Sequence, residues 1–139
     1  MARALVIDDD DPMRTLMRRM LERAGHEVTE ARDGVEAVRL FETRRVDLVV
    51  VDLYLPHQDG WATIRALHRI VPDLPFIVVS GGGALELVRR GSRGTLAAAR
   101  GAAQFRVLRK PFRRDALAAA ARERLPGAPT GAVHAESAS

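Results

Sequence analysis

The residues of this chain that could do chemistry are acidic side chains and one ammonium group, placed where apolar runs end. Asp8 and Asp9 follow the first apolar run, and Asp52 follows a run of Leu and Val. Lysine occurs once among the 22 Lys and Arg residues, as Lys110. Lys offers a compact point charge on a flexible stem, whereas Arg offers a rigid planar fork. Carboxylates that can hold a cation, together with an ammonium that can follow an anion, indicate phosphate chemistry.

Five apolar runs have the composition of β-strands, and each is followed by a stretch with helical character. Several runs are continuous rather than alternating, which is typical of strands buried on both faces in a parallel sheet covered by helices. The sequence therefore predicts an α/β fold with five β-α units. The predicted strands are residues 4–7, 28–31, 46–51, 76–79 and 105–108.

The first helix has the clearest boundaries. Asp11 is the predicted N-cap, Pro12 the first helical residue, and Gly25 the residue that ends the helix. The opposite face of this helix is mostly Arg and Glu, and we expect it to face solvent. Its predicted buried stripe is Met13, Leu16, Met17, Met20, Leu21 and Ala24, at helical spacing.

The remaining helices differ in how well the sequence marks them. Asp33 to Glu36 resembles a capping box that begins the second helix, and the third begins near Asp59. Glycines interrupt the fourth, of which only residues 95–103 have helical character, and the fifth spans about 113–125. The residues predicted to face inward are Val35, Val38 and Phe41, then Trp61, Ile64, Leu67 and Val71, and finally Leu117 and Leu125.

The composition predicts a single soluble domain. A chain of 139 residues can bury a core without disulfides, and it contains no Cys. No apolar segment approaches the length of about 20 residues needed to span a membrane, so we expect a soluble protein. The absence of Cys fits a reducing compartment, and we expect the cytoplasm. The net charge of +4 comes from Arg interleaved with Asp and Glu, which is typical of a solvated surface rather than a nucleic-acid site. Residues 1–125 form the predicted domain, and 126–139 a disordered tail without a DNA-binding domain.

Topology brings the chemically competent residues together. In an open parallel sheet, ligands bind beyond the carboxyl ends of the strands, where helix N-termini favour anions. Asp8 and Asp9 end the first strand, Asp52 the third and Ser80 the fourth, and Lys110 follows the fifth. Each has an ordinary explanation as a cap, a turn residue or a surface charge. Their conjunction predicts one site.

These residues resemble those of the receiver domain of bacterial two-component response regulators, over residues 3–125. The resemblance implies a flavodoxin-like doubly wound sheet with strand order 2-1-3-4-5 and helices on both faces. It depends on four motifs: Asp8-Asp9, the segment Asp52 to Gly60, Ser80-Gly81 and Lys110-Pro111-Phe112.

The resemblance implies that Asp52 accepts a phosphoryl group from a phosphohistidine, carried by a sensor histidine kinase or a histidine phosphotransfer protein. Three carboxylates and Lys110 give the site a formal charge of about −2, which one Mg²⁺ would cancel. By family analogy Asp9 and Asp52 touch the metal, Asp8 acts mainly through water, and the Tyr54 backbone carbonyl supplies another oxygen. The protein would act as a phosphoacceptor switch rather than as an enzyme.

The resemblance also implies how the switch would work, and the chain departs from the family there. Ser80 and Lys110 would move toward the phosphoryl group and reshape the face made by helix four, strand five and helix five. Val107 stands where the family often has Tyr or Phe. Gly81 and Gly82 predict a mobile loop, so we expect signalling through ordering of residues 81–95.

Two other functions remain open from the sequence. Asp8 to Asp10 could imitate the nucleophile motif of haloacid-dehalogenase phosphohydrolases, but Pro12 stands where that motif has Thr or Val, and the chain has no room for a cap domain. The second alternative is a receiver-like binding module that does not use phosphate. Phosphate on Asp52 would exclude both.

Overall fold

The computed structural model describes residues 2–52, 60–80, 105–109 and 113–124. Five parallel strands form one sheet in the order β2-β1-β3-β4-β5, which confirms the predicted fold class and strand order. The strands are β1 (Arg3–Ile7), β2 (Glu27–Ala31), β3 (Leu48–Asp52), β4 (Phe76–Ser80) and β5 (Phe105–Arg109). The helices are α1 (Asp11–Arg23), α2 (Gly34–Thr43), α3 (Gly60–Ile70) and α6 (Arg114–Arg124).

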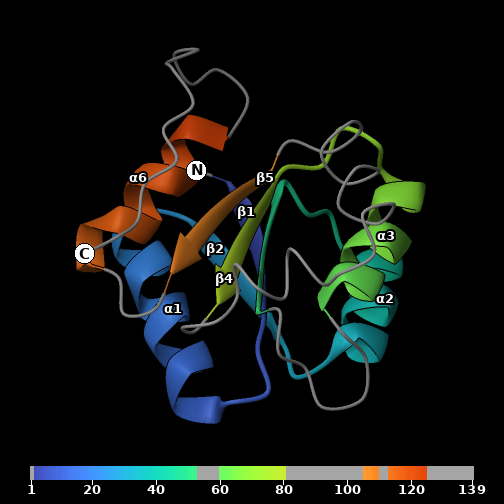
Figure 1. Cartoon of the computed structure of the whole chain (residues 1–139), viewed down its shortest axis with the longest axis horizontal. Helices are drawn as coiled ribbons and strands as arrows, with labels where there is room; N and C mark the ends of the chain where they lie inside the picture. The colour runs from blue at the N-terminus through green and yellow to red at the C-terminus, as the bar shows by residue number, and fades with distance from the viewer. Residues whose placement is uncertain (1, 53–59, 81–104, 110–112, 125–139) are drawn as a thin grey trace.

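Helices cover both faces of the sheet. Figure 1 shows α1 and α6 on one face and α2 and α3 on the other, and each pair is in mutual contact. Successive strand residues point to opposite faces, so the core divides into two apolar clusters. Leu5, Ile7 and Val49 pack with α2 and α3, whereas Val6 and Val50 pack with α1 and α6. This explains why β3 is apolar from Leu48 to Val51 without alternation.

The C-terminal end of α1 follows the prediction. The backbone N–H of Gly25 donates to the Glu22 carbonyl at 3.0 Å, and that of His26 to the Leu21 carbonyl at 3.1 Å. These two bonds form a Schellman motif, which needs a left-handed residue after the helix. Gly25 fills that position with φ of 95°.

The N-terminal end of α1 differs from the prediction. Asp11 is the first helical residue rather than the N-cap, and the cap position falls on Asp10, whose side chain makes no capping hydrogen bond. The Asp11 carboxylate does not cap the helix but accepts a hydrogen bond from Arg14 at 2.6 Å. For α2 the predicted cap is confirmed, because the Asp33 carboxylate accepts from the Glu36 backbone N–H at 2.8 Å.

Three residues that were predicted to face the core from the first two helices are exposed. Leu16 is 46% exposed and Val35 58%, while Ala24 lies past the last helical residue of α1 and is exposed. Residues on an α-helix are about 100° apart, so Leu16 lies well off the line through buried Met17. Val35 is about 200° from buried Ala37, on the opposite side of α2.

The other helices follow the predicted pattern in the parts that the structure describes. Ile64, Leu67 and Leu117 are buried, whereas Val71, one residue past α3, is 36% exposed. The predicted helical stretch 95–103 and the tail 126–139 lie outside the described residues. In the described part of the chain, the helices are too short or too polar to cross a bilayer.

Candidate metal and phosphate site

The acidic residues lie at the carboxyl edge of the sheet, where β1 and β3 are neighbours. Ile7 pairs with Val51 in the parallel register between these strands. Asp8 follows Ile7 and Asp52 follows Val51, so the sheet itself places the two carboxylates side by side. Asp9 extends the group along the loop that leads from β1 into α1.

One carboxylate oxygen from each of Asp8, Asp9 and Asp52 lies within 4.8 Å of the other two. Asp8 is fully buried and Asp52 is 4% exposed, whereas Asp9 is exposed. Burying like charges this close together is unfavourable unless a cation or hydrogen-bond donors compensate. The arrangement has the charge and the opening to solvent expected of a cation site.

The donor set fits Mg²⁺. This ion takes oxygen ligands at about 2.0–2.1 Å and keeps several waters, so two direct ligands on opposite sides of the ion are about 4.2 Å apart. The largest separation allowed between the three carboxylate oxygens, 4.8 Å, is close to this distance between opposite ligands. This spacing is compatible with two carboxylates that bind directly and a third that binds through water, which is the arrangement implied by the family resemblance.

Hydrogen bonds hold the loop between β1 and α1 in place. The Asp8 backbone N–H donates to the Ala31 carbonyl at 3.1 Å, and the Asp10 N–H donates to the Asp8 carboxylate at 2.9 Å. The Asp8 carbonyl oxygen accepts from the Arg14 guanidinium at 2.9 Å. Asp8 is thus held through its N–H, its carbonyl and its carboxylate.

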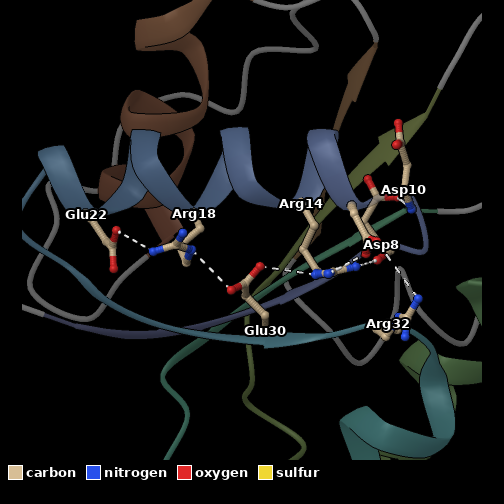
Figure 2. A network of polar contacts seen from close by, with 8 residues as sticks. Asp8, Asp10, Arg14, Arg18, Glu22, Glu30 and Arg32 are labelled. Atoms are coloured by element: carbon tan, nitrogen blue, oxygen red, sulfur yellow. Dashed lines mark hydrogen bonds and ion pairs between the residues drawn. The ribbon is translucent and has the colours of Figure 1, made fainter.

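Arg14 also belongs to a row of ion pairs between α1 and β2 (Figure 2). Its guanidinium donates to Glu30 at 3.1 Å and to Asp11 at 2.6 Å. Arg18 pairs with the other oxygen of Glu30 at 3.1 Å and with Glu22 at 3.2 Å. The guanidinium of Arg14 and its hydrogen bond hold the pKa of the Asp11 carboxyl below its ordinary value.

Sequence reasoning missed the role of Arg14. The Arg and Glu face of α1 was expected to face solvent, yet the Arg14 side chain is only 13% exposed. Burial opposes the charged form of its guanidinium, but the hydrogen bonds and charges of Asp11 and Glu30 outweigh burial and raise its pKa. Spacing along α1 contains no signal for this contact, because Glu30 comes from β2, 16 residues further along the chain.

The other predicted site residues are only partly described. Ser80 is the last residue of β4 and pairs in register with Arg109, the last residue of β5. Their backbones lie at the same edge of the sheet as the acidic cluster, and Lys110 is the next residue along the chain. Lys110 itself, Tyr54, Gly81 and Gly82 lie outside the described residues, and Val107 is described only as part of β5.

The sequence profile of the response regulator receiver domain matches residues 4–122. The chain belongs to this family. Response regulator MprA of Mycobacterium sp. strain KMS is 42% identical over 78 residues, which are 56% of this chain and 34% of MprA. The chain thus matches about a third of the length of that curated relative.

Solved receiver domains have the same fold. The receiver domain of NtrX from Brucella abortus is 30% identical, with a TM-score of 0.76 over 89% of this chain and 98% of that one. TrrA from Thermotoga maritima is 26% identical, with a TM-score of 0.73 over 90% of this chain and 100% of that one. TrrA was solved in complex with Mg²⁺ and BeF.

Family membership indicates which general function the acidic cluster serves. Receiver domains are signalling switches of two-component systems, they interact with histidine kinases, and they bind Mg²⁺ at an acidic pocket. In this receiver, the cluster of Asp8, Asp9 and Asp52 lies at the carboxyl edge of the sheet.

Proposed function

We propose that this receiver accepts a phosphoryl group on Asp52 in a Mg²⁺-dependent reaction. The donor is a phosphohistidine on a sensor histidine kinase or a histidine phosphotransfer protein. The observation that supports this most directly is the cluster of three carboxylates within 4.8 Å of one another in a chain of the receiver family. Asp52 is the last residue of β3, the middle strand of the sheet, which pairs with β1 and β4.

In the proposed transfer, a carboxylate oxygen of Asp52 attacks the phosphorus atom of the phosphohistidine. An O–P bond forms while the P–N bond breaks, and the departing imidazole keeps the electron pair of that bond and takes a proton from solvent. The product is an acyl phosphate on Asp52. Its surroundings determine the rate mainly through positioning and charge.

Asp9 and Asp52 would bind Mg²⁺ directly, Asp8 mainly through water, and the Tyr54 backbone carbonyl would complete the protein ligands. Bound Mg²⁺ supplies positive charge to the phosphoryl oxygens and so favours the transfer. The TrrA complex with Mg²⁺ and BeF supports Mg²⁺ binding by this receiver through similarity.

Phosphorylation changes the charge at Asp52 from −1 to nearly −2. In the proposed switch, Lys110 and the Ser80 hydroxyl move toward the new anion. The register that pairs Ser80 with Arg109 supports this, because it brings the ends of β4 and β5 together. The signal would then pass through ordering of residues 81–95, including Gly81 and Gly82, since Val107 replaces the usual aromatic residue. A target protein would bind the face made by helix four, strand five and helix five.

The wider context is also proposed. We place the phosphoacceptor domain at residues 1–125, followed by a tail at 126–139, in a cytoplasmic protein. Stand-alone action without a DNA-binding domain stays a prediction, since the chain matches about a third of MprA. Slow loss of phosphate from Asp52 would reset the switch.

Incubation with acetyl phosphate and Mg²⁺, followed by intact mass measurement, tests the proposal. We expect one phosphoryl adduct that maps to Asp52, and none with Asp52→Asn or in the presence of EDTA. Lys110→Arg should fold and bind Mg²⁺ but respond weakly to phosphorylation. An adduct on Asp8 with repeated turnover of a small phosphomonoester would favour a phosphohydrolase. No adduct on any residue would favour a binding module that does not use phosphate.

A further inference from the structure

A side chain holds the peptide group that joins Asp8 to Asp9. Its carbonyl oxygen accepts a hydrogen bond from the Arg14 guanidinium at 2.9 Å. The preceding N–H, that of Asp8, is held by the Ala31 carbonyl of β2 at 3.1 Å. The Arg14 contact therefore fixes the orientation of the peptide from which the Asp9 side chain departs.

Arg14 is well suited to fix this peptide because its guanidinium is itself held at two other points. Glu30 on β2 accepts from Nε at 3.1 Å, and Asp11 on α1 accepts from Nη2 at 2.6 Å, which leaves Nη1 for the Asp8 carbonyl. The planar guanidinium fixes the directions of its donors relative to one another. Figure 2 shows the Arg14 side chain reaching from α1 toward Asp8 on one side and Glu30 on the other.

We infer that Arg14 is a positioning residue for the Mg²⁺ site: by holding the carbonyl of Asp8, it directs the Asp9 carboxylate toward Asp52. This inference rests on the proposed function, because it concerns the same acidic cluster. Arg14 does not act as a metal ligand, since it carries only donors and a positive charge. Its effect on the metal passes through the backbone of Asp8 and Asp9.

Two other accounts of Arg14 give different expectations. As a cation near the cluster, Arg14 repels Mg²⁺, so a purely electrostatic role predicts tighter binding when the charge is removed. If Arg14 only forms ion pairs that join α1 to β2, replacing it should lower the stability of the protein and leave its Mg²⁺ affinity unchanged. A positioning role alone predicts that Mg²⁺ binding weakens even when the charge is kept.

Arg18 offers a matched control. It lies one turn further along α1 and pairs with the same Glu30, at 3.1 Å, and with Glu22 at 3.2 Å. Among its described contacts, none is with the Asp8 backbone. Replacing Arg18 therefore disturbs the ion pairs between α1 and β2 while leaving the Asp8 carbonyl contact in place.

The experiment compares the full chain with Arg14→Lys, Arg14→Gln and Arg18→Lys. Mg²⁺ affinity is measured by titration calorimetry, and stability by urea unfolding without divalent ions. Lys keeps the charge of Arg14 but cannot hold three acceptors in one plane. We expect both Arg14 variants to bind Mg²⁺ about tenfold more weakly, as is typical when a residue that supports metal ligands is lost. Arg18→Lys should bind Mg²⁺ as tightly as the wild type, even if its stability falls as much as that of the Arg14 variants.

Each other outcome has a clear meaning. Wild-type affinity in Arg14→Lys would overturn the inference, and so would tighter binding by Arg14→Gln or equal weakening in Arg18→Lys. These results would leave the proposed function intact, because the wild type would still bind Mg²⁺. No Mg²⁺ binding by the wild type would instead contradict the proposed function, and this inference with it.

Discussion

Replacing Asp52 with Asn should make the metal-free protein more stable. Asp8, Asp9 and Asp52 bring three carboxylate oxygens within 4.8 Å of one another, and folding brings Asp52 next to Asp8 and Asp9, from which it is far apart in the unfolded chain. Asn keeps the size and shape of Asp while removing one negative charge. The variant should therefore relieve repulsion without leaving a cavity.

The size of the effect follows from the distances. Two unit charges 4.8 Å apart interact by about 3–4 kcal/mol at an effective dielectric constant of about 20. The pair between Asp52 and buried Asp8 is weakly screened, whereas that with exposed Asp9 is screened more strongly. Asp52 also takes part in other polar or electrostatic interactions, and their weakening offsets part of the gain. We expect the free energy of unfolding to rise by about 1–2 kcal/mol.

Urea unfolding in EDTA measures this difference, with Asp73→Asn as the control. Asp73 is exposed in the turn before β4, at the opposite edge of the sheet from the cluster, so its replacement removes a charge without relieving the cluster. We expect no stabilisation from Asp73→Asn. Added Mg²⁺ should stabilise the wild type more than Asp52→Asn, because the wild type binds the ion more tightly. Equal or lower stability of Asp52→Asn in EDTA would refute the reasoning.

Three further predictions concern the scaffold. Gly25→Ala should lower the free energy of unfolding by about 1–2 kcal/mol, because φ at this position is 95°; an unchanged urea midpoint would contradict this. Asp33→Ala should lower the free energy of unfolding by about 0.5–2 kcal/mol through loss of the cap on α2. Asp33→Ser should retain most of the stability, because Ser can also cap a helix. Burial lowers the pKa of His26, so the unfolded chain takes up a proton first as the pH falls below about 6.5. Stability should then decline until the pH passes the lower pKa of the folded state, and His26→Gln should decline less between pH 7 and 5.

The sequence predicted the fold and the acidic cluster well because both depend on short-range patterns. Strands β1, β3 and β4 contain continuous apolar runs, and the predicted limits of all five strands differ from the observed ones by two residues at most. Parallel strands place their carboxyl ends at one edge, so residues directly after them, such as Asp8 and Asp52, must lie near one another once the strand order is known. No long-range side-chain contact had to be guessed.

The errors concern the direction in which a helix faces, and periodicity alone does not determine it. In α2 the apolar residues Val35, Val38 and Phe41 predict one packed face, but small Ala37 is fully buried and Val35 is exposed. A stripe of large apolar residues gives the approximate side of a helix, and a rotation of some tens of degrees changes which residues at its margins are covered. The sheet beneath the helix sets that rotation.

Arg14 shows the same limit for a polar residue, with more consequence for function. In sequence it is one of many Arg residues on the charged face of α1, and only the pairing of β1 with β2 brings Glu30 within 3.1 Å of it. Once Glu30 fixes the guanidinium, the remaining donor meets the Asp8 carbonyl. The residues expected to hold the metal could thus be found from strand ends, whereas the residue inferred to orient them depends on contacts among three elements. A search for functional residues in this family should therefore include buried Arg side chains that bond to the backbone of the acidic loop.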